Sequence, residues 1–220
     1  MLIIRRLSLL FCAIMLHLHA QTPFVVMVNP AGDARNPGRM LDDGFERGAT
    51  FQCAELLKHS LMQQPTNIQV VFTRVPGETL EPLQAANFAN RLKAHCYLSI
   101  HCYREQEMRP RLSVYHYQTT TNQLQQYLSD HLRFSCFDQA HLYSSTQTRL
   151  WTTCCKEVLE RPEFRQLYEF LGVWGIPFSP LVGIQVPAFA LEIGIKEIGD
   201  IALIVSPLTH MIQALQKNLS

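Results

Sequence analysis

Three polar residues with the chemistry of a hydrolytic or metal site lie at the borders of apolar segments. Glu46 opens a stretch with helical spacing, and His101 and Glu192 each end or interrupt an apolar run. Carboxylates and imidazoles bind metal ions and transfer protons in hydrolytic enzymes. Glu192 carries the most information, because a carboxylate after the apolar run 187–191 is costly to bury without a purpose or a partner.

The elements that would position these residues follow from hydrophobic spacing. Short apolar runs predict strands, and apolar residues spaced three or four apart predict helices. The expected strands are 24–28, 68–72, 96–101, 112–117 and 188–193, and the expected helices are 45–63, 80–93, 122–133, 148–171 and 206–218. This alternation predicts one α/β domain with a twisted, mainly parallel sheet and helices on both faces. In such sheets chemistry gathers at strand ends.

The first 20 residues have the pattern of a signal peptide. Arg5 and Arg6 precede the apolar run 7–18, and Ala20 precedes the expected cleavage site. We therefore assign residues 1–20 to a signal peptide and residues 21–220 to the exported domain. The bulky Leu18 leaves an uncleaved N-terminal anchor as the alternative. We expect no segment after residue 20 to be long and apolar enough to span a bilayer.

Composition narrows the function classes. The chain is 47% hydrophobic and 17% charged, and its formal net charge is +1 without a Lys/Arg-rich run, so we expect no nucleic-acid partner. Six cysteines follow residue 20, which permits disulfides in an exported chain. Cys53 and Cys96 lie in apolar patterns and are expected to pack as small hydrophobes. One bridge is expected among Cys136, Cys154 and Cys155.

The polar segments, taken in order, resemble those of the zinc-dependent N-acetylmuramoyl-L-alanine amidases, a family of cell-wall enzymes. Residues 29–38 fit, without a gap, the family motif Asp-Pro-Gly-His-Gly-Gly-x-Asp-Pro-Gly. The further matches, each weak alone, are Glu46-Arg47, Thr73-Arg74, Ala89-Asn90, Ser99-Ile100-His101 and Glu192-Ile193-Gly194. The resemblance runs from about residue 24 to residue 215 and is weakest over 120–180.

The resemblance implies a reaction and roles for three residues. The family binds zinc with two His and one Glu, and a second Glu is the general base. Carried over, Glu46 is a metal carboxylate, His101 is a metal imidazole and Glu192 is the catalytic base. The bond cut would join the lactyl group of muramic acid to L-alanine of the stem peptide. The implied partners are peptidoglycan and an activator protein, and the implied location is the periplasm or cell envelope.

The chain also departs from the family at its metal site. The first metal His of the motif falls on Gly32, which has no side chain. Asp33 is the nearest substitute, and it would make a Glu/Asp/His site that is less selective for zinc. Cys102 is another donor nearby, but along a strand it would point to the face opposite His101. Two hypotheses follow: an amidase with a modified metal site, or an inactive amidase-fold protein that binds peptidoglycan or a partner protein. The loss at Gly32 favours the second, and the retention of the other three residues favours the first.

Each candidate residue also has a purely structural interpretation. Glu46 could stabilise a helix N-terminus, His101 could be a hydrogen-bonded core histidine, and Asp33 could be a turn residue. Arg74 is expected to brace the end of the sheet. Trp151 and Trp174 are expected to pack in the core or a lid, with a sugar-binding platform as the alternative. His95 and His116 are expected to have no role.

Overall fold

The computed structural model describes residues 22–81, 83–107, 109–119 and 137–219. A six-stranded sheet forms the centre of the domain, in the order β4-β1-β5-β8-β6-β7. Its strands are β1 (Phe24–Pro30), β4 (Ile68–Phe72), β5 (Cys96–Arg104), β6 (Arg111–Tyr117), β7 (Glu169–Ile176) and β8 (Ala188–Ile195). All neighbouring strands are parallel except β6 and β8. The predicted mainly parallel α/β sheet is therefore confirmed.

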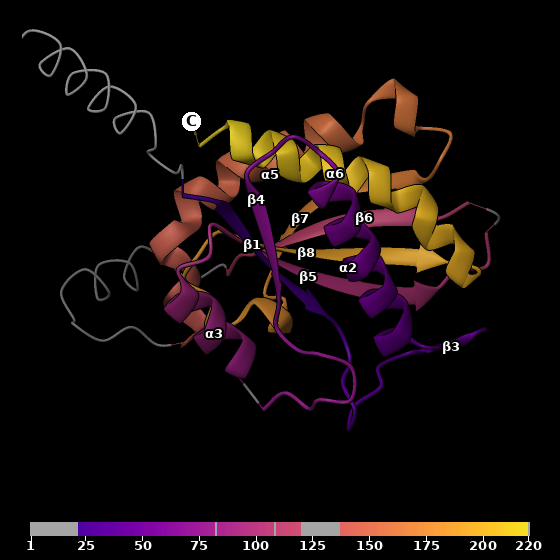
Figure 1. Cartoon of the computed structure of the whole chain (residues 1–220), viewed down its shortest axis with the longest axis horizontal. Helices are drawn as coiled ribbons and strands as arrows, with labels where there is room; N and C mark the ends of the chain where they lie inside the picture. Colours follow the sequence, from indigo (N-terminus) through magenta and orange to yellow (C-terminus); the bar gives the residue numbers. More distant parts are fainter. Residues whose placement is uncertain (1–21, 82, 108, 120–136, 220) are drawn as a thin grey trace, which may run out of the picture.

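Helices cover both faces of this sheet, as predicted (Figure 1). The helices α2 (Glu46–Met62), α5 (Ser145–Leu159) and α6 (Ile201–Lys217) pack together over one face. The shorter α3 (Gln84–Leu92) packs Ala86 and Ala89 against Met27 and Tyr97 on the other face. Each face of the sheet therefore has its own apolar cluster, and the larger one lies beneath α2, α5 and α6.

The helix α6 corrects one expectation from the sequence. Together with the turn before it, the segment Ile198–Lys217 is long and apolar enough to cross a membrane by length and composition. In the structure, however, its apolar face is part of the core, where Ile204, Leu208 and Ile212 are fully buried. A helix that packs against two others and a sheet is apolar for that reason. The helix also begins earlier than predicted, with Pro207 inside it.

The region after α5 is the main error of the sequence analysis. A helix was expected over 148–171, but α5 ends at Leu159 and the strand β7 begins at Glu169. Arg161 and Pro162 separate them, and a residue before proline is biased away from helical geometry. The strand was missed because Gly172 and Gly175 interrupt its apolar pattern. The predicted signal peptide, the helix 122–133 and Cys136 lie outside the described residues.

The cysteines within the described residues are free and buried: Cys53, Cys96, Cys102, Cys154 and Cys155. Burial raises the pKa of the Cys53 thiol to about 12 and also raises the pKa of the Cys102 thiol. These cysteines are therefore protonated at neutral pH and pack as small hydrophobes, as expected for Cys53 and Cys96. The expected bridge is not formed between Cys154 and Cys155, which are both free.

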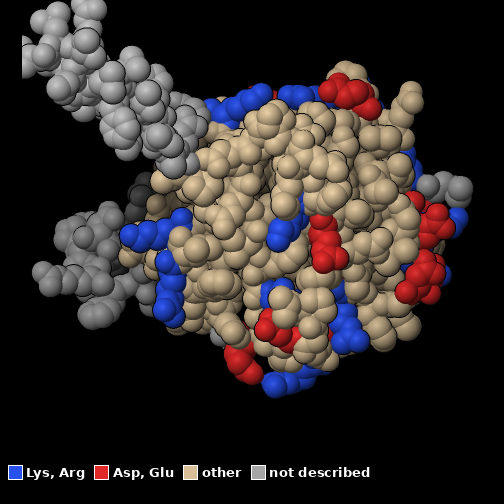
Figure 2. Space-filling model, viewed as in Figure 1, with Lys and Arg blue, Asp and Glu red and all other residues tan. Residues whose placement is uncertain are grey.

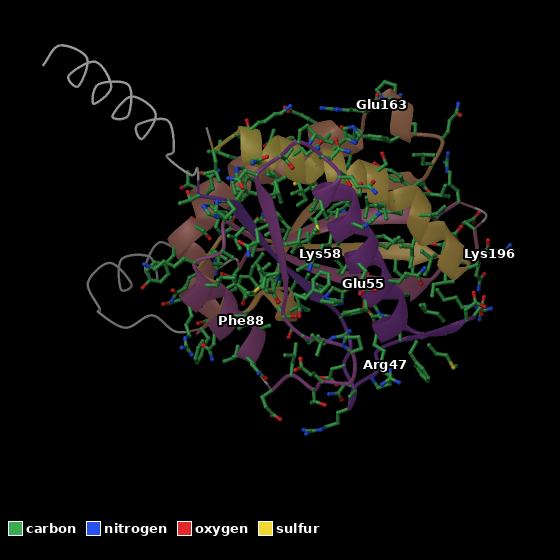
Figure 3. All side chains as sticks on the ribbon, viewed as in Figure 1. Arg47, Glu55, Lys58, Phe88, Glu163 and Lys196 are labelled. Carbon is green, nitrogen blue, oxygen red and sulfur yellow. The ribbon has the colours of Figure 1, made fainter. Side chains whose placement is uncertain are left out.

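Charged residues lie along the helix α2. Arg47, Glu55 and Lys58 follow one another along α2 (Figure 3). Lys58 also places its ammonium group 5.1 Å from the centre of the Phe72 ring. On the face shown in Figure 2, basic and acidic side chains lie in small, separate groups among uncharged residues.

Candidate functional site

The sheet register brings His101 and Glu192 together. They are directly paired residues on the parallel strands β5 and β8, in the carboxyl-terminal half of each strand. Paired residues of neighbouring strands project from the same face of a sheet. These two residues are therefore neighbours, toward the end of the strands where α/β proteins place their catalytic residues.

Glu46 reaches the same place from the first turn of α2. Its Oε1 atom lies 3.3 Å from His101 Nδ1, and its side chain is almost fully buried. Oε1 also accepts the Cys102 backbone N–H at 3.1 Å, and Oε2 accepts the Arg39 N–H at 3.0 Å. Burial by itself would raise the pKa of Glu46. The hydrogen bonds from His101, Arg39 and Cys102 outweigh burial and hold that pKa below its ordinary value, so Glu46 is a carboxylate at neutral pH.

The loop between β1 and α2 is tied to the start of that helix. The Thr50 hydroxyl lies 2.8 Å from the Ala31 carbonyl oxygen, and the Arg47 N–H donates to the Pro37 carbonyl. A short hairpin of β2 (Met40–Leu41) and β3 (Gly44–Phe45) lies between β1 and α2 and leads into α2. As predicted, Arg74 braces this edge, because its guanidinium donates to the carbonyls of Pro30, Ala31 and Arg47.

The imidazole of His101 is held on both sides. Its Nε2 atom lies 2.9 Å from the Ser99 hydroxyl, opposite the contact of Nδ1 with Glu46. This order of Ser99, His101 and Glu46 resembles a nucleophile, base and acid. Ser99 is fully buried, however, and its hydroxyl also accepts a hydrogen bond from Asn29. We therefore assign Ser99 to orienting the imidazole.

Asp33 lies apart from this group and has the contacts of a turn residue. Its Oδ1 atom accepts the backbone N–H groups of Arg35 and Asn36, and its Oδ2 atom accepts that of Leu80. Burial opposes ionisation of Asp33, but these hydrogen bonds outweigh it and lower the pKa below its ordinary value. Both oxygens thus have backbone partners, and the carboxylate joins two loops.

The donors present do not complete a zinc centre. With bonds of about 2.0–2.2 Å, two ligands of a tetrahedral zinc lie roughly 3.4 Å apart, and the 3.3 Å between Glu46 and His101 matches such a pair. A catalytic zinc needs a third protein ligand. Across the described part of the chain, no group of three His, Cys, Asp or Glu side chains is placed to hold a metal ion. Cys102 points away into the core beneath α2, as the strand alternation predicted.

Gly32 is fixed as glycine by its surroundings. Its φ of +75° lies in the left-handed region, and a Cβ atom there would lie 2.8 Å from Arg47 Cβ and 2.9 Å from the Pro37 carbonyl oxygen. A side chain at this position therefore requires the loop to move. The absence of the family's histidine at this position is therefore a property of the loop backbone as well as of the side chain.

The sequence analysis missed Arg39. Its guanidinium lies 2.8 Å from Glu192 Oε1, and the Glu192 side chain is 16% exposed. The burial cost of this carboxylate, noted in the sequence, is therefore met by a cation from the loop. The one sequence signal for Arg39 is its place directly after the motif ending at Gly38.

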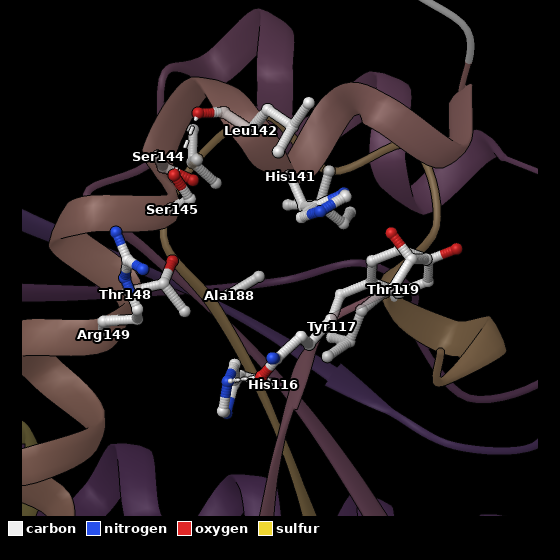
Figure 4. Close-up of a pocket in the computed structure, with 14 residues that line it drawn as sticks. His116, Tyr117, Thr119, His141, Leu142, Ser144, Ser145, Thr148, Arg149 and Ala188 are labelled. Carbon is white, nitrogen blue, oxygen red and sulfur yellow. Dashed lines mark hydrogen bonds between the residues drawn. The ribbon is translucent and has the colours of Figure 1, made fainter. Parts of the chain in front are cut away.

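A cavity of about 230 Å³ lies at the opposite end of the sheet (Figure 4). Since β6 runs antiparallel to β8, the carboxyl end of β6 meets Ala188 at the start of β8. His116 and His141 line the cavity, and burial lowers the pKa of both imidazoles. Residues 120–136 lie outside the described residues. The cavity is separate from the site around Glu192.

Solved structures of other proteins share the fold of this chain. The catalytic domain of CwlV, an N-acetylmuramoyl-L-alanine amidase from Bacillus (Paenibacillus) polymyxa, is 17% identical, with 88% of this chain and 98% of that chain covered and a TM-score of 0.57. Ami1 of Mycobacterium smegmatis is 13% identical, with coverages of 89% and 97% and a TM-score of 0.63. The CwlD amidase of Clostridioides difficile, solved in complex with the GerS lipoprotein, is 14% identical, with coverages of 88% and 98% and a TM-score of 0.56.

These likenesses establish the shared fold, and no curated protein sequence matches the chain. The family itself follows from a sequence comparison. The model of the N-acetylmuramoyl-L-alanine amidase family matches residues 26–215, which include every site residue described above. The chain therefore belongs to the N-acetylmuramoyl-L-alanine amidase family.

Proposed function

We propose that this peptidoglycan hydrolase-like protein acts on the amide bond between the lactyl group of muramic acid and L-alanine, with Glu192 as the proton acceptor. One observation carries the proposal. The register pairs Glu192 with His101 in the carboxyl-terminal halves of β8 and β5, and Glu46 contacts the same imidazole. Family membership supports peptidoglycan as the substrate.

The residues of this chain suit proton transfer at such an amide. Glu192 would accept a proton from water as the water oxygen bonds to the carbonyl carbon. The same proton would pass to the amide nitrogen as the carbon–nitrogen bond breaks, giving a lactyl carboxylic acid and a free L-alanine amine. The Arg39 guanidinium lies beside Glu192 and would have to shift for the carboxylate to reach the water.

Zinc was implied by the family resemblance, with Glu46, His101 and, more weakly, Asp33 as ligands. Only the first two come together, and Asp33 is engaged by three backbone N–H groups. The reaction proposed for this chain therefore has no step at a metal.

A half-exposed tryptophan supports a place for the glycan beside the site. Glu192 pairs with Ser113 on β6, and Ser113 pairs with Gly172 on β7, so the three form a row across neighbouring strands. The Trp174 indole lies over Gly172, since a Cβ atom at Gly172 would be 3.5 Å from the indole nitrogen, and Trp174 is 52% exposed. Two strand spacings, about 10 Å, separate Glu192 from Gly172 beneath this indole. Trp151, by contrast, is buried in the core.

A second candidate function is binding of peptidoglycan without hydrolysis. Two observations favour it. The backbone at Gly32 leaves no room for the histidine that the family has there. Glu192, the proposed base, is already paired with Arg39. In this case the same surface would hold the muramoyl peptide and leave the amide intact.

The location and partners of the protein belong to the same proposal. A signal peptide over residues 1–20 would deliver the domain to the cell envelope or periplasm, where peptidoglycan lies. The structure of CwlD with the GerS lipoprotein supports a partner protein for an amidase of this fold.

The experiment incubates the mature chain with purified sacculi and measures soluble stem peptide and bound protein together. Glu192→Gln is the test variant, and Glu163→Gln, an exposed residue outside the site (Figure 3), is the matched control. Release by the wild type and the control, but not by Glu192→Gln, supports hydrolysis. Binding without release by any of the three proteins supports the second candidate, and neither binding nor release overturns both.

A further inference from the structure

The backbone of Arg39 forms two hydrogen bonds with Glu46. The Arg39 N–H donates to Glu46 Oε2, and the Arg39 carbonyl accepts the Glu46 N–H at 2.8 Å. Gly38 allows this approach, because its φ is +79° and a Cβ atom there would lie 2.6 Å from Glu46 Oε2. The start of the Arg39 side chain is therefore fixed beside one carboxylate, while its guanidinium contacts another, Glu192.

The two carboxylates need a positive charge between them. Glu46 and Glu192 both adjoin His101, one through a side-chain contact and one through the strand register. Like charges at such a site disfavour ionisation of both groups unless a cation is near. In the zinc amidases resembled by this sequence, the metal supplies that charge. Here the side chain in contact with Glu192 is Arg39.

The donor atoms that a metal would use already have other partners. Both oxygens of Glu46 accept backbone N–H groups, and His101 Nε2 lies beside the Ser99 hydroxyl. Gly32 has no side chain, and its backbone leaves no room for one. We propose that Arg39 takes the place of the metal as the positive charge of this site, so that the site is metal-independent. The inference concerns the site of the proposed function and rests on that proposal only for the identity of the substrate.

Metal content is the first test. The mature chain is dialysed against zinc and then against buffer, and its zinc is measured by mass spectrometry. We expect far less than one zinc per chain, and a thermal unfolding midpoint that neither zinc nor EDTA changes. About one zinc per chain, with a lower midpoint in EDTA, would overturn the proposal.

Variants of Arg39 test the charge itself. Arg39→Gln removes the cation and should raise the affinity for zinc about tenfold, because a divalent ion then meets two carboxylates without a competing positive charge. Arg39→Lys keeps the charge and should keep the weak affinity of the wild type. Arg35→Gln is the control, since Arg35 lies on the same loop and is exposed, 3.5 Å from Glu81.

A purely structural role for Arg39 would give the two Arg39 variants the same zinc affinity, and that result would contradict the proposal. Circular dichroism confirms that each variant is folded before zinc is added. These measurements need no peptidoglycan. A failure to release stem peptide would therefore leave the metal result standing, and a metal-bound wild type would leave the proposed reaction standing.

Discussion

His101 and Glu192 lie side by side on β5 and β8, although they come from opposite halves of the chain. Each contacts a charged partner: His101 contacts Glu46, the first residue of α2, and Glu192 contacts Arg39 in the loop before that helix. The site is thus a strand pair closed by one loop and the helix that follows it. Its chemistry depends on the conformation of that loop as much as on the two strand residues.

The loop conformation predicts that the missing histidine cannot be restored by one substitution. Gly32→His should lower the free energy of unfolding by about 2 kcal/mol or more, because its backbone is left-handed and the new Cβ meets Arg47. We expect no gain of zinc binding. Urea unfolding and zinc titration of the variant measure both effects.

Gly48→Ala is the matched control for that substitution. Gly48 lies in α2 with nothing within 4 Å of a Cβ atom, so alanine should stabilise the protein by about 0.5–1 kcal/mol. A Gly32→His protein that is as stable as the wild type, or that binds zinc stoichiometrically, would show that our description of the loop is wrong.

Glu46 should make the protein sensitive to acid. Its pKa in the folded protein lies below the ordinary value of 4.5, so its stabilising contribution is complete above that pH and is lost as the pH falls through the lower folded value. Glu46→Gln should cost about 2 kcal/mol at pH 7 and should flatten the fall in stability below about pH 4.5. Asp33 and Glu105 also have lowered pKa values and will leave some acid sensitivity.

Unfolding free energies measured between neutral pH and about pH 3 test this prediction. Glu55→Gln, an exposed position on the same helix, should reproduce the wild-type curve. The assignment of Glu46 would be refuted if its variant kept the full acid dependence of the wild type.

Alanine substitutions of the two tryptophans should have different effects, one on the stability of the protein and the other on its binding to sacculi. Trp151 is 1% exposed in the core, so Trp151→Ala should lower the free energy of unfolding by about 3–5 kcal/mol. Trp174→Ala removes a half-exposed ring and should change stability little, while weakening the binding of sacculi several-fold. Co-sedimentation with sacculi measures the second effect. Unchanged binding in a folded Trp174→Ala protein would exclude this indole from the glycan site.

Features of this fold that depend on local sequence could be predicted, and features that depend on contacts between distant residues could not. The strand Ile68–Phe72 and the helix Glu46–Met62 matched their expected positions closely, because apolar spacing alone defines them. The edge strand β7 was missed, since an edge strand with two glycines carries little of that spacing. Glu46, His101 and Glu192 could be selected from motif order.

Arg39 could not be selected in that way, because 153 residues separate it from Glu192 and only the folded loop makes the pairing visible. The same holds for Asp33, whose candidacy as a ligand rested on its nearness to Gly32 in the chain. Its oxygens instead face the backbone of the loops around Asn36 and Leu80. Nearness in sequence is a poor guide to side-chain direction in a glycine-rich loop.

The most direct test of the central claim identifies the chemical group that the protein releases. Sacculi are treated with wild-type protein or with Glu192→Gln in the presence of EDTA, and new amino termini are labelled and identified by mass spectrometry. We predict new amino termini on L-alanine, with matching free lactyl groups on muramic acid, for the wild type only. Their absence from the wild-type digest, or their equal appearance with Glu192→Gln, would contradict Glu192-dependent cleavage at a metal-independent site.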